Sequence, residues 1–191
     1  MKQPSLSPRA MTEGMPHFNK GNLPVAFVFS VPGARELAEG RPAAADTGDN
    51  LTLALEFLNA ADPDTFPSVD RYEYRITNSW MEPLARSLGS PSSEPKDSEV
   101  RQPENTSRVV YEVRGCKLVV LCGSKAQLLT GWVQSPARIV AHACHTGNRG
   151  LNGKYKNQML PAVRLSADRR RARAELWAKE VLRSIADNQA T

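Results

Sequence analysis

Residues 26–51, AFVFSVPGARELAEGRPAAADTGDNL, determine how the first part of the chain folds. They begin with an apolar run typical of a buried strand and break at the Pro-Gly step of residues 32–33. A second turn, Gly-Arg-Pro at residues 40–42, precedes a helical pattern. A connection between a strand and a helix is usually ~2–6 residues long. This one is several times longer and is built of small, stiff residues, which allow backbone to approach a ligand closely.

The composition is that of an ordinary globular domain, with 191 residues, 40% hydrophobic and 24% charged. No apolar run approaches the ~20 residues that a membrane-spanning helix needs. The start, MKQPSLSPRAMTEG, lacks the apolar core of a secretory signal peptide. We therefore expect a cytoplasmic protein with no membrane partner. The net charge of +5 is compatible with binding phosphates but does not by itself indicate it.

Three cysteines, Cys116, Cys122 and Cys144, are too few for a four-cysteine metal or cluster site. Their spacing also matches no zinc motif. Cysteine is among the most frequently buried residue types, so we expect these three to pack as small apolar groups. The sequence predicts no metal.

Strands and helices alternate along the sequence. Apolar and alternating runs predict strands at residues 24–30, 71–78, 117–122 and 137–145, and helical spacing predicts helices at 49–60, 124–132 and 166–187. This alternation indicates an α/β fold with three α/β/α layers and a mostly parallel central sheet. We expect residues 1–20 to be a flexible N-terminal segment and residues 21–191 a single domain, in which the Ser/Pro/Glu-rich residues 88–107 form an exposed internal linker.

Ligands of open parallel sheets bind just beyond the carboxyl ends of the strands. The four predicted strands end in SVPG, TNSW, LCGS and HTGNRGLN. These ends contain no dinucleotide-binding fingerprint and no phosphate-binding Gly-Lys-Ser/Thr motif. They offer small-residue loops, one amide (Asn78) and one imidazole (His145), which suit a flat polar ligand and an anionic leaving group.

The order SVPGARELAEGRPAAADTGDNL, YRITNSW, KLVVLCGSKAQLLTG and HTGNRGLN resembles the uracil-DNA glycosylase superfamily over about residues 24–152. The resemblance is closest to its bacterial and archaeal iron–sulfur branches. It implies a uracil-DNA glycosylase-like fold and an enzyme that flips a base out of DNA and hydrolyses its N-glycosidic bond to leave an abasic site. Such a hydrolysis needs only water, so no cofactor is expected.

The resemblance also assigns roles to residues at the strand ends. Asn78 would hydrogen-bond the polar edge of the flipped base, because an amide offers both a donor and an acceptor. His145 would stabilise negative charge on the departing base. The first loop would line the base pocket with Ser30, Val31, Pro32 and Gly33.

Residues 146–152 would form the loop that enters the DNA groove. In that loop Leu151 is the predicted wedge, and Arg149 and Asn152 are predicted DNA contacts. Further phosphate contacts are predicted in the basic run near the start of the last helix, although a solvated helix face is the plainer interpretation of that run taken alone. The run comprises Arg169, Arg170, Arg171 and Arg173.

The sequence departs from the family in two ways that concern chemistry. Its three cysteines cannot bind the iron–sulfur cluster of those branches. Beside the first proline, where most relatives carry a carboxylate or amide that positions water, it has only Ser30 and Val31. We therefore expect Asp46 to orient the water or stabilise the sugar cation, with Glu36 as second choice and Asp49 as third.

A third departure concerns the size of the pocket. Relatives stack a phenylalanine on uracil after the Gly-Arg-Pro turn, and this chain has Ala43 there. Stacking of a base on an aromatic ring contributes ~1–3 kcal/mol, so its loss favours a roomier pocket and a bulkier base. This profile resembles that of a bacterial anti-phage glycosylase that removes glucosylated hydroxymethylcytosine from phage DNA. Two alternatives are a repair glycosylase for uracil or a deaminated base, with Trp80 or Trp132 as the stacking ring, and a non-catalytic nucleic-acid-binding relative.

Overall fold

The structure is a computed structural model that describes residues 15–158 and 166–189. Its sheet has five strands in the order β1-β3-β2-β4-β5, in which β1 is antiparallel to β3 and the other pairs are parallel. The strands are β1 (Phe18–Asn19), β2 (Val25–Phe29), β3 (Arg75–Asn78), β4 (Leu118–Cys122) and β5 (Ile139–Ala143). The α/β fold with a mostly parallel sheet that the sequence predicts is therefore confirmed, and its one antiparallel pair makes the sheet mixed.

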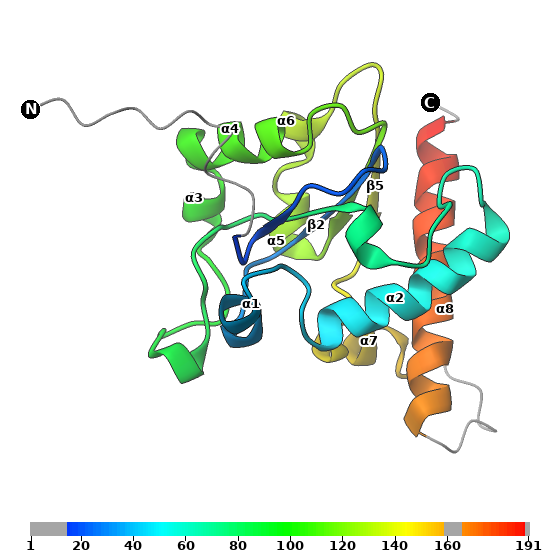
Figure 1. Ribbon diagram of the computed structural model, residues 1–191, viewed down its shortest axis with the longest axis horizontal. Helices are drawn as coiled ribbons and strands as arrows, with labels where there is room; N and C mark the ends of the chain where they lie inside the picture. The colour runs from blue at the N-terminus through cyan, green and yellow to red at the C-terminus, as the bar shows by residue number, and fades with distance from the viewer. Residues whose placement is uncertain (1–14, 159–165, 190–191) are drawn as a thin grey trace, which may run out of the picture.

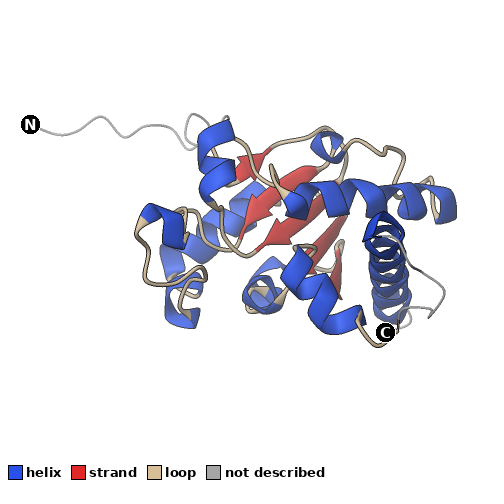
Figure 2. Cartoon of the chain, turned by 90° about the horizontal axis from the view of Figure 1, so that it is seen from below, coloured by secondary structure: helices blue, strands red, loops and turns tan. Residues whose placement is uncertain are grey.

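Helices cover both faces of this sheet (Figures 1 and 2). The helices are α1 (Ala34–Glu39), α2 (Asp46–Ala61), α3 (Asp97–Val100), α4 (Pro103–Glu112), α5 (Ser124–Gln127), α6 (Thr130–Val133), α7 (Asn148–Tyr155) and α8 (Ser166–Gln189), with short 3-10 turns η2 (Arg71–Glu73) and η3 (Arg86–Leu88). Among the described residues, no helix is both long and apolar enough to cross a membrane.

Alternate residues of the central strand β2 point to the two layers, as the pleat of a strand requires. Phe27 and Phe29 belong to the core that includes Leu51 of α2 and Trp177 of α8. The intervening residue Val28 belongs to a second core on the side of α4 and α6. Figure 1 shows α2 crossing α8 on one side of the sheet, away from α4 and α6.

Most predicted elements are confirmed, with shifted ends. The strands predicted at 24–30, 117–122 and 137–145 correspond to β2, β4 and β5, and the helix predicted at 49–60 begins earlier, at Asp46. Of the strand predicted at 71–78 only the last four residues pair, because the Asp70 carboxylate accepts the N–H of Tyr72 and starts a 3-10 turn instead. The helix predicted at 124–132 is two short helices.

The exposed linker predicted at residues 88–107 is wrong for its second half. These residues contain α3 and the start of α4, and Val100 is fully buried. The Asn105 side chain donates to the backbone carbonyls of Ser79 and Val100, at 2.7 and 2.8 Å, which fastens α4 to the end of β3. Pro103 suggested a loop in the sequence, but proline at the first position of a helix starts it without losing a hydrogen bond.

The flexible segment predicted at residues 1–20 is wrong for residues 15–20, and residues 1–14 lie outside the described residues. Phe18 and His17 are buried, and Phe18 pairs with Thr77 in β1. The Asn19 side chain also donates to the carbonyl of Tyr74 at 2.8 Å. A two-residue strand has too short an apolar pattern to be recognised in a sequence.

The long connection after β2 contains α1 and a tightly folded turn before α2. Ala43 is buried and has a positive φ of 50°, a conformation that side chains other than glycine rarely adopt. Its carbonyl accepts a hydrogen bond from the Tyr72 hydroxyl at 3.4 Å. The backbone of Gly48 packs against the same carbonyl, so closely that a Cβ at Gly48 would lie 1.8 Å from its oxygen.

We predict that Gly48→Ala lowers the free energy of unfolding by ~1–3 kcal/mol, because the added methyl collides with backbone that cannot rotate away. Gly153→Ala is the matched control, because Gly153 lies in α7 with open space around its Cβ position. Alanine stabilises a helix by ~0.5–1 kcal/mol relative to glycine, so this variant should be at least as stable as wild type. Urea denaturation measures both. Equal stability of wild type and Gly48→Ala would contradict the close approach.

Candidate functional site

A cavity of about 740 Å³ opens at the carboxyl ends of the four parallel strands. It contains Phe29 and Ser30 from the end of β2, Asn78 from β3, Lys125 after β4 and His145 after β5. The strand ends that the sequence singled out therefore meet in one place. Nine of the predicted site residues line this cavity: Ser30, Val31, Gly33, Glu36, Ala43, Asp46, Asn78, His145 and Arg149.

His145 is held in one tautomer by the backbone. The N–H of Gly147 donates to its Nδ1 at 2.9 Å, so in the neutral ring the proton is on Nε2. Nε2 makes no hydrogen bond to any residue that the structure describes, and its N–H can be donated to a ligand. Phe29 packs edge-on against the ring, with the centroids 5.4 Å apart.

Burial lowers the pKa of His145, and the nearby carboxylates of Glu94 and Glu36 oppose that shift without cancelling it. The imidazole is therefore neutral at neutral pH. A neutral N–H donor next to an apolar ring suits the stabilisation of a negative charge that develops on a ligand.

Asn78 is buried at the end of β3, with only 4% of its surface exposed. In the amide orientation that satisfies its neighbours, its nitrogen donates to the carbonyl of His17 and its oxygen accepts from the N–H of Val31, both at 3.2 Å. An asparagine amide can make two donor and two acceptor contacts. One donor and one acceptor position therefore remain for a ligand.

The three carboxylates proposed to orient water lie in different surroundings. Asp46, the first residue of α2, lines the cavity and accepts a hydrogen bond from Asn148 at 2.7 Å. Glu36 lines it too, but its two oxygens accept backbone N–H groups. Asp49 is not among the cavity residues; it lies 3.5 Å from Arg170.

Sequence reasoning missed a fourth carboxylate, Glu94, because its Ser/Pro-rich surroundings were interpreted as a linker. It lines the cavity and accepts a hydrogen bond from the Ser30 hydroxyl. Nothing in the local sequence distinguishes it from an ordinary surface glutamate. Only the fold brings it to the end of β2.

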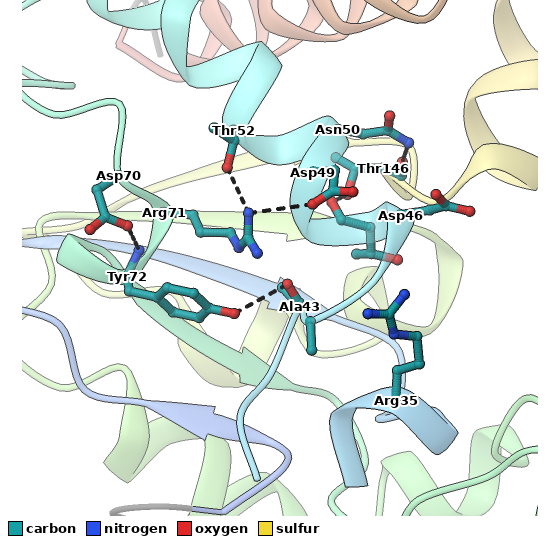
Figure 3. A network of polar contacts seen from close by, with 12 residues as sticks. Arg35, Ala43, Asp46, Asp49, Asn50, Thr52, Asp70, Arg71, Tyr72 and Thr146 are labelled. Carbon is teal, nitrogen blue, oxygen red and sulfur yellow. Dashed lines mark hydrogen bonds and ion pairs between the residues drawn. The ribbon is translucent and has the colours of Figure 1, made fainter. Parts of the chain in front are cut away.

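Polar contacts around Asn50 join the loop of His145 to α2 and α8. The buried Asn50 amide donates to the carbonyl of Thr146 at 2.6 Å and accepts from Arg170 Nε at 2.5 Å. Figure 3 shows the neighbouring part of this network, in which Arg71 bonds Thr52 at 2.9 Å and lies 3.7 Å from Asp49.

The predicted groove-entering loop is corrected by the structure. Residues 148–155 form α7, and Leu151 is 1% exposed, packed in the core with α2 and α8. A side chain buried in this way cannot act as a wedge between bases. Arg149 is exposed and lines the cavity, whereas Pro32 is buried and is not among the cavity residues.

The basic run of α8 points in two directions. Arg170 bonds residues of α2, and Arg171 of α8 bonds Glu56 of α2 at 2.6 Å, so both guanidinium groups have partners within the protein. Arg169 and Arg173 line another hollow, of about 490 Å³, together with Asn152, Lys156 and Ser166.

The two tryptophans proposed as stacking rings lie elsewhere. Trp80 lines a separate hollow of about 590 Å³ beside α4, and Trp132 is 45% exposed on α6. Neither is among the residues of the His145 cavity, whose aromatic ring is Phe29.

The cysteines behave as apolar groups. Cys116 and Cys122 are buried, and burial raises the pKa of Cys144 to about 11, so its thiol stays protonated at neutral pH. In the described part of the chain, no group of three or more His, Cys, Asp or Glu residues could bind a metal ion.

Comparison with known proteins gives no family. No protein-family model matches the chain, and the search of curated proteins found no match. The geometry of the cavity is therefore the basis for any functional assignment.

We predict that His145 makes stability depend on pH. Because its pKa is lower in the folded than in the unfolded protein, the contribution of the neutral ring is fully present above about pH 6.5. It is lost as the pH falls through the lowered folded-state pKa. Wild type should therefore lose more unfolding free energy than His145→Gln between about pH 7 and about pH 5.

Partial desolvation also lowers the pKa of His142, although its side chain is exposed, so His142→Gln serves as the control that retains the contribution of His145. Urea unfolding at each pH gives the free energies. NMR titration of the imidazoles checks the cause directly, and a His145 midpoint above about pH 6.5 would contradict the prediction.

Proposed function

We propose that this chain is a DNA glycosylase with a uracil-DNA glycosylase-like fold. The observation that supports it best is the neutral imidazole of His145, with a free Nε2–H, in one cavity with the amide of Asn78. That pair can bind the polar edge of a flipped base and stabilise its anion as the N-glycosidic bond breaks. The order of the sequence motifs supports the same proposal.

The carboxylates of the cavity complete this chemistry. Asp46 and Glu36 line the cavity, and in this proposal their negative charge stabilises the positive charge that develops on the sugar in an oxocarbenium-like transition state. Neither the imidazole nor a carboxylate requires a metal or an organic cofactor for this reaction. The enzyme would be monofunctional, with water as the nucleophile, and would act in the cytoplasm.

The cavity favours a bulky modified cytosine, such as glucosylated hydroxymethylcytosine of phage DNA, as substrate. A volume of about 740 Å³ exceeds what a single pyrimidine fills, and Ala43, which lines the cavity, has no aromatic ring to occupy that volume. The second candidate, a repair glycosylase for uracil or a deaminated base, is favoured by Phe29, an aromatic ring already within the cavity.

We predict that His145→Ala lowers the rate of base release ~10²–10³-fold, the usual effect of removing a donor that stabilises an anion. His142→Ala is the matched control, because His142 lies on the preceding strand β5, is exposed and is not among the cavity residues. The measurement is single-turnover release of free base from duplexes that contain uracil, hypoxanthine, hydroxymethylcytosine or its glucosylated form.

The pattern of release separates the candidates. Release from the enlarged bases supports the anti-phage assignment, and release from uracil or hypoxanthine alone supports repair. Binding of DNA without release from any duplex would overturn the enzymatic proposal in favour of a non-catalytic nucleic-acid-binding protein.

We further predict that Arg149 contacts a DNA phosphate at the rim of the cavity. The logarithm of the affinity for duplex DNA should fall with the logarithm of salt concentration, and Arg149→Gln should flatten this slope by ~0.9. Arg171→Gln is the control, because Arg171 bonds Glu56 and should leave the slope unchanged. Fluorescence anisotropy across a salt series measures both, and the reverse ranking would place the DNA on α8.

A further inference from the structure

Glu94 is the cavity carboxylate that the structure places against the end of β2. We propose that it orients and deprotonates the water that attacks the sugar. This inference rests on the proposed glycosylase function and assigns its water-activating residue to a segment that none of the sequence motifs covers.

Two contacts fix Glu94 in place. The Ser30 hydroxyl donates to its Oε2, and Ser30 itself is 4% exposed at the rigid end of β2. The backbone of Glu94 is turned by Ser92, whose hydroxyl donates to the Glu94 carbonyl at 2.8 Å and accepts its N–H at 3.1 Å. The carboxylate is therefore positioned although its loop is exposed.

Ser30 is held from the other side by β3. Its carbonyl accepts the Ser79 hydroxyl at 2.7 Å and the N–H of Trp80 at 3.0 Å. Because Asn78 ends the same strand, the groups proposed to bind the base and to activate water are fixed to two adjacent parallel strands. This is the rigid support that a positioned catalytic group needs.

The other carboxylates are less available as a base. Both oxygens of Glu36 accept backbone N–H groups, and the two oxygens of Asp46 face Asn148 at 2.7 Å and Arg170 at 3.6 Å. In contrast, Oε1 of Glu94 makes no hydrogen bond to any described residue. It keeps lone pairs for a water molecule.

Glu94 also lies close enough to His145 for its charge to act on the imidazole, whose pKa it raises against the effect of burial. A water molecule at Oε1 would thus share the cavity with the group that stabilises the departing base. The two groups carry out opposite tasks, acceptance of a proton from water and donation of a hydrogen bond to the leaving base.

The bond between C1′ and the base nitrogen breaks, and its electron pair leaves with the base, whose anion is stabilised by the His145 Nε2–H. The water oxygen forms a new bond to C1′, and one water proton passes to the Glu94 carboxylate. That proton is later released to solvent or to the base, so the products are the free base and an abasic sugar.

The test compares Glu94→Gln with wild type in single-turnover base release and in DNA affinity. Loss of a positioned general base should lower the rate ~10²–10⁴-fold, whereas the dissociation constant should change less than about threefold, because the amide keeps the size of the side chain. Glu104→Gln, an exposed glutamate of α4 outside the cavity, is the matched control and should retain the wild-type rate.

A second variant, Glu94→Ala, distinguishes loss of the carboxylate from distortion of the fold. In Glu94→Ala, added formate can occupy the vacated position and should restore part of the rate, which a distorted fold would not allow. Thermal unfolding checks that the variants fold. Release of base by wild type together with an unchanged rate in Glu94→Gln, or a loss that formate does not restore, overturns the role of Glu94 alone. Failure of wild type to release any base overturns the proposed function itself.

Discussion

The fully buried amide of Asn50 is the contact on which the arrangement of the site depends most. It lies in the first turns of α2, donates to the carbonyl of Thr146 directly after His145, and accepts from Arg170 of α8. One side chain of α2 therefore joins two segments that lie 96 and 120 residues further along the sequence. A buried amide without these partners would cost roughly 1–3 kcal/mol, so the three segments have a strong preference for one arrangement.

The opening of α2 and the long loop before it are fixed by a second polar group, the carboxylate of Glu36. By accepting the N–H groups of Gly33 and Ala44, it closes the loop on itself and gives these two donors an acceptor. The small residues of this loop are therefore explained by packing as well as by ligand access. Gly48 and Ala43 approach so closely that a larger side chain at residue 48 cannot fit.

The sequence was sufficient to predict the central strands and the meeting of their ends, because apolar runs such as residues 118–122 and the turns after them have strong local patterns. It was insufficient for elements that tertiary contacts decide. The strand of Phe18 is too short to show a period, and α4 begins with a proline. Leu151 was expected on the surface, but α7 turns it into the core.

The site residues also differ in whether local sequence patterns or tertiary contacts determine their positions. Asn78 ends one parallel strand and His145 follows another, so a rule of topology brings them together, and no knowledge of side-chain packing is required. Glu94 is brought to Ser30 only by the path of a segment that lacks periodic structure, and Arg170 pairs across 120 residues with Asn50. Contacts of this kind depend on the complete fold, so a local sequence pattern cannot predict them.

Behind Asn78, on the α4 side of the sheet, a buried charged network supports the site from the opposite direction. Arg108 donates to the carbonyl of Asn78 at 2.9 Å and to Glu112 at 2.5 Å. Glu112 in turn bonds Thr77 at 2.5 Å and His17 at 3.2 Å.

Burial lowers the pKa of Arg108, and the charge of Glu112 opposes this. Such a buried pair adds little net stability compared with apolar packing, but the loss of one partner leaves an uncompensated charge, so the pair favours a single geometry over its alternatives. His17, the residue directly before β1, joins this strand to the network. The N-terminal end of the described chain thus helps to fix the orientation of the amide that would contact a base, which gives a strand of only two residues a structural role in the site.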